Sequence, residues 1–106
     1  ANTISILSYS ESFESGIGFW SQASGDDGDW IEYSNATPSS GTGPSSASDG
    51  STYLYIEASN NSTPGEIGAN ASAVLDGPCL DLTTLLNVQF EFDYHTFGAD
   101  IGSIII

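Results

Sequence analysis

Carboxylates are the reactive groups that this sequence offers in number, and Asp26, Asp27 and Asp29 lie within four residues just before Trp30. Hard cations such as Ca2+ take six to eight oxygens from carboxylates and backbone carbonyls, which an acidic loop containing glycine supplies. The spacing is not that of an EF-hand, because no glutamate closes a twelve-residue loop. The stretch therefore predicts either a bound Ca2+ or Na+ ion or a solvated turn in which an aspartate caps backbone amides.

The charge balance of the chain limits the classes of molecule that it can bind. Its 106 residues carry 14 Asp and Glu, one His and neither Lys nor Arg, which gives a net charge of −14. Nucleic acid is excluded as a partner because nothing neutralises phosphates, and docking on an anionic membrane is excluded for the same reason. Water and salt, bound metal ions or a partner must balance the carboxylates. A saline, extracellular setting suits this composition.

Three other sets of residues give weaker indications of a catalytic, metal-binding or disulfide-forming role. His95 is the only histidine and stands in a strand pattern, which favours a hydrogen-bonded structural histidine over a base or zinc ligand. Cys79 is the only cysteine, so it is either a small buried hydrophobe or a partner for a cysteine of another chain. Glu91 and Asp93 share one strand face, as in many alternating strands, and do not predict glycoside hydrolysis. We expect no enzyme activity.

Strands are the elements that must position these residues. Residues 88–97 alternate, with Val88, Phe90, Phe92 and Tyr94 on one face, which predicts a half-buried strand of an antiparallel sheet. Residues 51–59 predict a second strand. Weaker strand patterns cover residues 3–9, 18–22, 29–33, 70–75 and 102–106, and residues 80–87 predict one helical turn.

Short strands with polar connections indicate a single all-β domain over residues 1–106, built as an antiparallel jelly-roll sandwich. The polar stretch 35–50 is either a flexible linker or a long surface loop. No apolar run reaches the length of a membrane-spanning helix, so membrane insertion is not expected.

The aromatic residues allow a further interpretation, which is a sugar-binding face. Tyr53 and Tyr55 beside Glu57, together with Trp20 and Trp30, could form a face that stacks on a sugar. Packing in the core is the other interpretation, and it is favoured for the two tryptophans.

Five segments in order resemble a MAM domain, the adhesion module of meprins, neuropilins and receptor tyrosine phosphatases. They are FESGIGFW at 13–20, DDGDW at 26–30, TPSSGTGP at 37–44, YLYIEAS at 53–59 and FDYHTFGADIGSI at 92–104. The resemblance implies a non-catalytic, extracellular jelly-roll module for adhesion, recognition or self-association within a secreted or surface protein. It also implies a cation site, with Glu14, Asp26, Asp27 and Asp29 as candidate ligands.

The sequence departs from the family pattern in its cysteines and in its length. Cysteines of the animal domains are replaced at about Glu11, Gly18 and Gln89, which favours a bacterial type. A complete MAM domain extends beyond the strand at 102–106, so we expect its C-terminal strands to be missing or supplied by another segment. A carbohydrate-binding module of jelly-roll type and a structural subunit of a surface fibre, completed by strand addition, are the alternatives.

Overall fold

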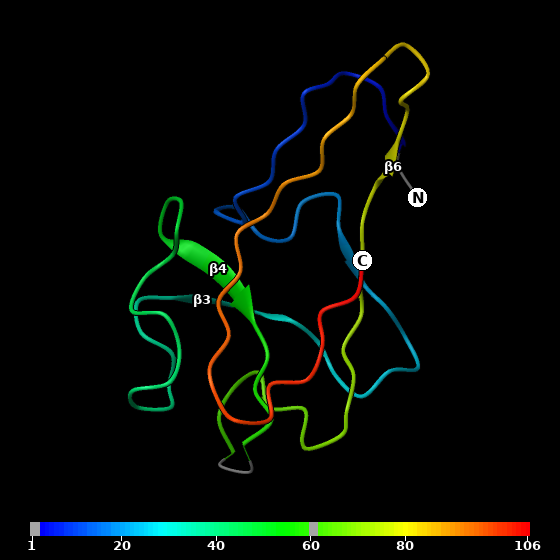
Figure 1. The fold of residues 1–106 in the computed structure, drawn as a ribbon. Helices are drawn as coiled ribbons and strands as arrows, with labels where there is room; N and C mark the ends of the chain where they lie inside the picture. Colours follow the sequence, from blue (N-terminus) through cyan, green and yellow to red (C-terminus); the bar gives the residue numbers. More distant parts are fainter. Residues whose placement is uncertain (1–2, 60–61) are drawn as a thin grey trace.

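A computed structural model describes residues 3–59 and 62–106, which form six short strands and no helix. The strands are β1 (Thr3–Ile4), β2 (Ser21–Gln22), β3 (Ile31–Ser34), β4 (Thr52–Tyr55), β5 (Leu75–Asp76) and β6 (Cys79–Leu80). They pair into three separate two-stranded sheets, β1 with β6, β2 with β5 and β3 with β4 (Figure 1). The predicted all-β class is thereby confirmed, whereas a jelly-roll sandwich is not seen in the described residues.

The longest pairing joins β3 and β4 in an antiparallel hairpin, with Ile31 opposite Tyr55 and Tyr33 opposite Tyr53. Tyrosine and isoleucine favour strands because their side chains pack across a pleated surface. The rings of Tyr33, Tyr53 and Tyr55 meet at angles between 56° and 72°, with centroids 5.5 to 6.4 Å apart. This tyrosine cluster fixes the hairpin.

The connection from β3 to β4 contains the polar stretch 35–50, which the sequence predicted to be either a flexible linker or a long surface loop. Because β3 and β4 pair directly, residues 35–51 form a long loop within one unit, and the interpretation as a linker between two units is wrong. The Thr42 hydroxyl donates to the Ser39 carbonyl oxygen at 2.8 Å, which closes a turn inside this loop.

The two other sheets are only two residues long on each strand. β2 pairs with β5 in antiparallel register, Gln22 opposite Leu75, and β1 pairs with β6 in parallel register, Thr3 opposite Cys79. The helical turn predicted in 80–87 is reduced to one hydrogen bond, in which the Leu85 amide donates to the Leu82 carbonyl oxygen. No helix in the described part of the chain is long and apolar enough to cross a bilayer.

Residues 88–106, which we call the C-terminal ribbon, contradict two strand predictions. Neither 88–97 nor 102–106 is a strand, and every residue of the ribbon is exposed (Figure 1, orange to red). The expected half-burial of Val88, Phe90, Phe92 and Tyr94 is therefore wrong. The alternation itself is right, but a strand needs a neighbour for its backbone groups, and none of the backbone hydrogen bonds between described residues involves the ribbon.

The molecule is open as a consequence. Its radius of gyration is 15.1 Å, against about 13 Å for a compact domain of this length. Its accessible surface is 7677 Å², whereas a folded monomer of 11.0 kDa exposes roughly 5600 Å². The excess is roughly 2000 Å², and Tyr55 is the only buried side chain among the described residues.

Candidate functional site: the acidic clasp and the C-terminal ribbon

The acidic loop holds the backbone of a distant segment. The Val74 amide donates to Asp26 Oδ2 at 2.6 Å, and the Ser72 amide donates to Asp27 Oδ2 at 2.7 Å. In return the Asp27 amide donates to the Ser72 carbonyl oxygen at 2.9 Å. We call this arrangement of Asp26 and Asp27 with residues 72–74 the acidic clasp. It caps backbone amides, but those of a segment more than forty residues along the chain rather than of its own turn.

Trp30 and Gln22 extend the acidic clasp into the neighbouring sheet. The Trp30 indole N–H donates to the Ala73 carbonyl oxygen at 3.2 Å. The Gln22 side chain both accepts from the Trp30 amide and donates to the Trp30 carbonyl oxygen. Trp30 and Trp20 are half-buried rather than fully enclosed, so they pack as expected only in part.

The acidic clasp gives a prediction that does not depend on metal. Asp26→Asn combined with Asp27→Asn should lower the free energy of unfolding by about 1 to 2 kcal/mol, because charge-assisted bonds to two amides are weakened. Urea denaturation in the presence of a chelator measures this. Asp49→Asn, an exposed acid in the long loop, is the control and should leave stability almost unchanged. Equal stability of the double variant and the control would contradict the structural role of the acidic clasp.

Glu14 lies at another place, the start of β4. Its Oε1 accepts from the Ser51 amide at 2.9 Å and from the Thr52 amide at 2.6 Å, and the Ser51 hydroxyl donates to Oε2. The Thr52 amide, followed by the Ser51 amide, lowers the pKa of the Glu14 carboxyl. Gly50 has a positive φ of 66°, and a Cβ there would lie 2.6 Å from the carboxylate of Glu14.

The lowered pKa of Glu14 predicts a pH dependence. A carboxyl with a lower pKa in the folded state stabilises the fold above its unfolded pKa of about 4.3 and loses that contribution as pH falls through the folded pKa. We therefore expect Glu14→Gln to be less stable than the native chain at pH 6, by a difference that shrinks in acid as pH falls through the folded pKa. Chemical denaturation at a series of pH values measures this, and a difference that persists unchanged into acid would contradict it.

Three of the four predicted cation ligands accept hydrogen bonds from backbone amides, and they do so in two places. Asp26 and Asp27 belong to the acidic clasp, Glu14 holds the start of β4, and Asp29 is exposed. In the part of the chain that the structure describes, no three His, Cys, Asp or Glu side chains form a group that could hold a metal ion. The Ca2+ or Na+ site stays a prediction, and calorimetric titration of the chelator-treated chain with Ca2+ tests it.

The tyrosines proposed for sugar stacking are turned to internal contacts. Tyr55 is 8% exposed and its hydroxyl donates to the Pro64 carbonyl oxygen, while the Tyr53 hydroxyl donates to the Asn35 carbonyl oxygen. Desolvation raises the pKa of both phenols. Glu57 accepts from the hydroxyls of Ser39 and Thr63. Core packing is therefore the role of Tyr55, as the second interpretation of these aromatics expected.

The C-terminal ribbon carries most of the exposed aromatic residues instead. Phe90, Phe92 and Tyr94 follow one another with ring centroids 5.6 and 5.9 Å apart. This aromatic row shows that alternate side chains share one face, as the sequence predicted. All nine large apolar side chains of the ribbon are between 46% and 90% exposed: Val88, Phe90, Phe92, Tyr94, Phe97, Ile101, Ile104, Ile105 and Ile106.

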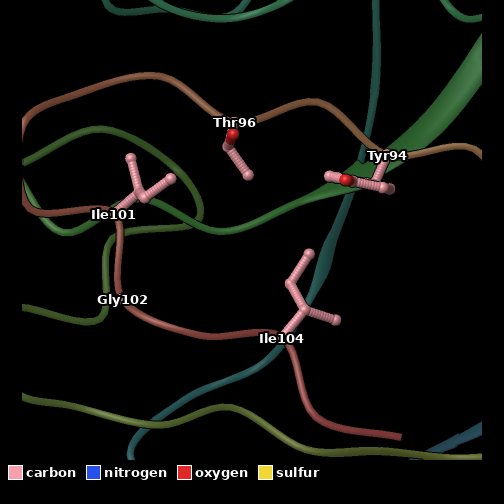
Figure 2. Close-up of a pocket in the computed structure, with 5 residues that line it drawn as sticks. All are labelled: Tyr94, Thr96, Ile101, Gly102 and Ile104. Atoms are coloured by element: carbon pink, nitrogen blue, oxygen red, sulfur yellow. The ribbon is translucent and has the colours of Figure 1, made fainter.

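An open hollow lies where the ribbon turns back on itself. Figure 2 shows Tyr94 and Thr96 on one pass of the chain and Ile101 and Ile104 on the returning pass. The hollow has a volume of about 350 Å³, within the range of ligand pockets, but such pockets enclose most of a ligand. Its lining residues are all exposed, so the hollow is the space between two unpaired passes.

The remaining candidate residues are all exposed, in β6 or in the C-terminal ribbon. Cys79 is exposed in β6, so its interpretation as a small buried hydrophobe is wrong, while pairing with a cysteine of another chain stays a prediction. His95 is exposed in the ribbon, and no hydrogen bond of its side chain to another described residue is seen, contrary to the expectation of a hydrogen-bonded structural histidine. Glu91 and Asp93 are also exposed.

Residues 72–74 are hydrogen-bond partners of the acidic loop and Trp30 that the sequence did not indicate, since the side chains of serine, alanine and valine give no signal of this role. Their contribution comes from backbone amides, which every residue except proline possesses. Comparison with protein-family models gives no match, and no solved structure matches the chain.

Proposed function

We propose that this chain is a non-catalytic recognition module of a secreted or cell-surface protein, which binds its partner by accepting an added strand along the C-terminal ribbon. The single observation that carries the proposal is the exposure of the whole ribbon, with its alternating pattern and without backbone partners among the described residues. An extended segment whose backbone N–H and C=O groups are unpaired can recruit a second extended segment through main-chain hydrogen bonds. The resemblance to MAM adhesion modules supports the same role.

The surface excess supports an interface of substantial size. Obligate interfaces bury 2000 Å² or more in total, and the excess of roughly 2000 Å² on this one chain is of that order. The nine exposed large apolar side chains of the ribbon add to this argument, because exposed apolar patches commonly mark interaction sites.

Self-association under screening conditions tests the proposal without a known partner. Repulsion between chains of charge −14 should keep the protein monomeric at low salt, and about 1 M NaCl shortens the screening length to about 3 Å. The ribbon should then drive dimers or larger oligomers, which analytical ultracentrifugation detects. Phe90→Ser combined with Phe92→Ser should abolish this association, whereas Phe19→Ser, at an aromatic residue that is 54% exposed outside the ribbon, should not.

Two outcomes would overturn the proposal. One is a monomer at all salt concentrations, and the other is association that the Phe90 and Phe92 substitutions leave unchanged.

A carbohydrate-binding module is the second candidate, because the aromatic row is exposed and nearly regular. Rings spaced along one extended segment offer stacking faces to successive sugars of a linear glycan. Retardation in polysaccharide affinity gels that is lost in Phe92→Ala would favour this candidate. Equal migration of both chains in every gel would count against it.

A further inference from the structure

We propose that the partner strand alternates apolar residues with lysine or arginine, and that it docks along residues 88–97, which we call the acceptor segment. This inference rests on the proposed function and adds the chemistry of the partner. It follows from the placement of acidic side chains between the aromatic residues, and from the absence of any basic side chain other than His95 in the sequence.

The acceptor segment has two chemically distinct faces. The aromatic row places Phe90, Phe92 and Tyr94 on one side, since their rings are mutual neighbours. Alternation along an extended chain then sets Glu91 and Asp93 on the other side, and both are exposed. A strand added beside this segment must therefore present apolar residues toward one face and groups that tolerate two carboxylates toward the other.

A second copy of this chain meets that requirement only when salt screens its carboxylates, as in the association test at about 1 M NaCl. If two acceptor segments paired in antiparallel register about Phe92, Glu91 of each copy would lie opposite Asp93 of the other. Like charges directly opposite one another destabilise a pair of strands. The two chains would also repel over a longer range, because each carries a net charge of −14.

A strand with basic residues at alternate positions fits it well. Each lysine or arginine would lie opposite or diagonal to Glu91 or Asp93, and such cross-strand pairs stabilise sheets. The strong negative field of the chain would also speed the encounter with a cationic partner. Opposite the aromatic row, the partner's apolar residues would cover surface that the chain leaves in water.

Four acetylated and amidated peptides of about ten residues, a typical strand's upper length, test the inference with the full chain. In the first, valine alternates with lysine. The second replaces lysine with threonine, the third replaces it with glutamate, and the fourth alternates glycine with lysine and so keeps the charge without the apolar face. Fluorescence anisotropy of labelled peptides at low salt measures affinity.

We expect the valine–lysine peptide to bind at least about tenfold more tightly than the other three, an advantage that falls steeply at high salt. Glu91→Gln combined with Asp93→Asn should remove its advantage over the threonine peptide. Glu32→Gln combined with Asp49→Asn makes the same change of net charge at exposed sites outside the ribbon and should preserve that advantage.

Three results would overturn the inference. Equal binding of the lysine and threonine peptides would show strand addition without preference for cations, and the proposed function would stand. Equal binding of the glycine–lysine peptide would show attraction by bulk charge alone. Binding of no peptide would remove the acceptor role for such strands, while the salt-dependent association would still decide the proposed function separately.

Discussion

Tyr55→Ala is expected to lower the free energy of unfolding by about 3 to 5 kcal/mol, the range found when a large aromatic side chain is removed from a core. Tyr55 is 8% exposed, contacts the rings of Tyr33 and Tyr53, and donates a hydrogen bond to the Pro64 carbonyl oxygen. A small domain has only about 5 to 15 kcal/mol of stability in total. The variant should therefore lose a large share of the stability of the chain, which urea denaturation and thermal denaturation followed by far-UV circular dichroism would measure.

Tyr94→Ala is the matched control for this loss. It removes the same side chain at a position that is 70% exposed, where substitutions usually change stability by less than about 0.5 kcal/mol. If both variants lost similar stability, the tyrosine cluster would not be the centre of the fold.

Gly65→Ala is expected to cost about 2 to 5 kcal/mol through two separate causes. Gly65 has a φ of +82°, and an added Cβ would lie 2.9 Å from Cε2 of the Tyr55 ring. An L-residue in this left-handed region costs about 1 to 2 kcal/mol, and overpacking adds about 1 to 3 kcal/mol. The Tyr55 hydroxyl donates to the Pro64 carbonyl oxygen in the same turn, so the ring cannot move away from Gly65 without straining or losing this bond.

Gly68→Ala separates these two causes. Gly68 has a similar φ of +84°, but an added Cβ would meet nothing within 4 Å. It should show the conformational cost alone, about 1 to 2 kcal/mol. Thermal and urea denaturation of both variants give the difference, which we attribute to the Tyr55 ring. Equal losses at the two glycines would contradict the close contact between Gly65 and Tyr55.

Local patterns predicted the β class and the two strands that carry the tyrosine cluster, but not the pairing of these strands. The alternation in residues 51–59 contains β4, and residues 29–33 overlap β3, because half-buried aromatic and branched side chains favour strands wherever a partner lies beside them. The pattern at 88–97 was as clear, yet no strand formed there. Alternation describes the two faces of a segment, but pairing depends on a neighbour that local sequence does not specify.

The candidate site could also be predicted only in part, since its acidic residues were identified but the groups that they bind were not. Clustered acids singled out Asp26 and Asp27, and the structure gives both a role as acceptors of backbone amides. The sequence could not identify the donors, since the amides of Ser72 and Val74 become partners only when the chain folds. The sequence could not identify the donors to Glu14 either, because its role as an acceptor depends on where folding places the amides of Ser51 and Thr52.

Amide hydrogen exchange of residues 88–97 tests the central claim, that the C-terminal ribbon accepts an added strand, most directly. In the monomer at low salt these amides should exchange rapidly, because their backbone groups have no partners among the described residues. In the associated state at about 1 M NaCl, every second amide should be protected at least about tenfold, since one edge of a strand offers alternate N–H groups. Rapid exchange throughout the segment in the associated state would contradict the account.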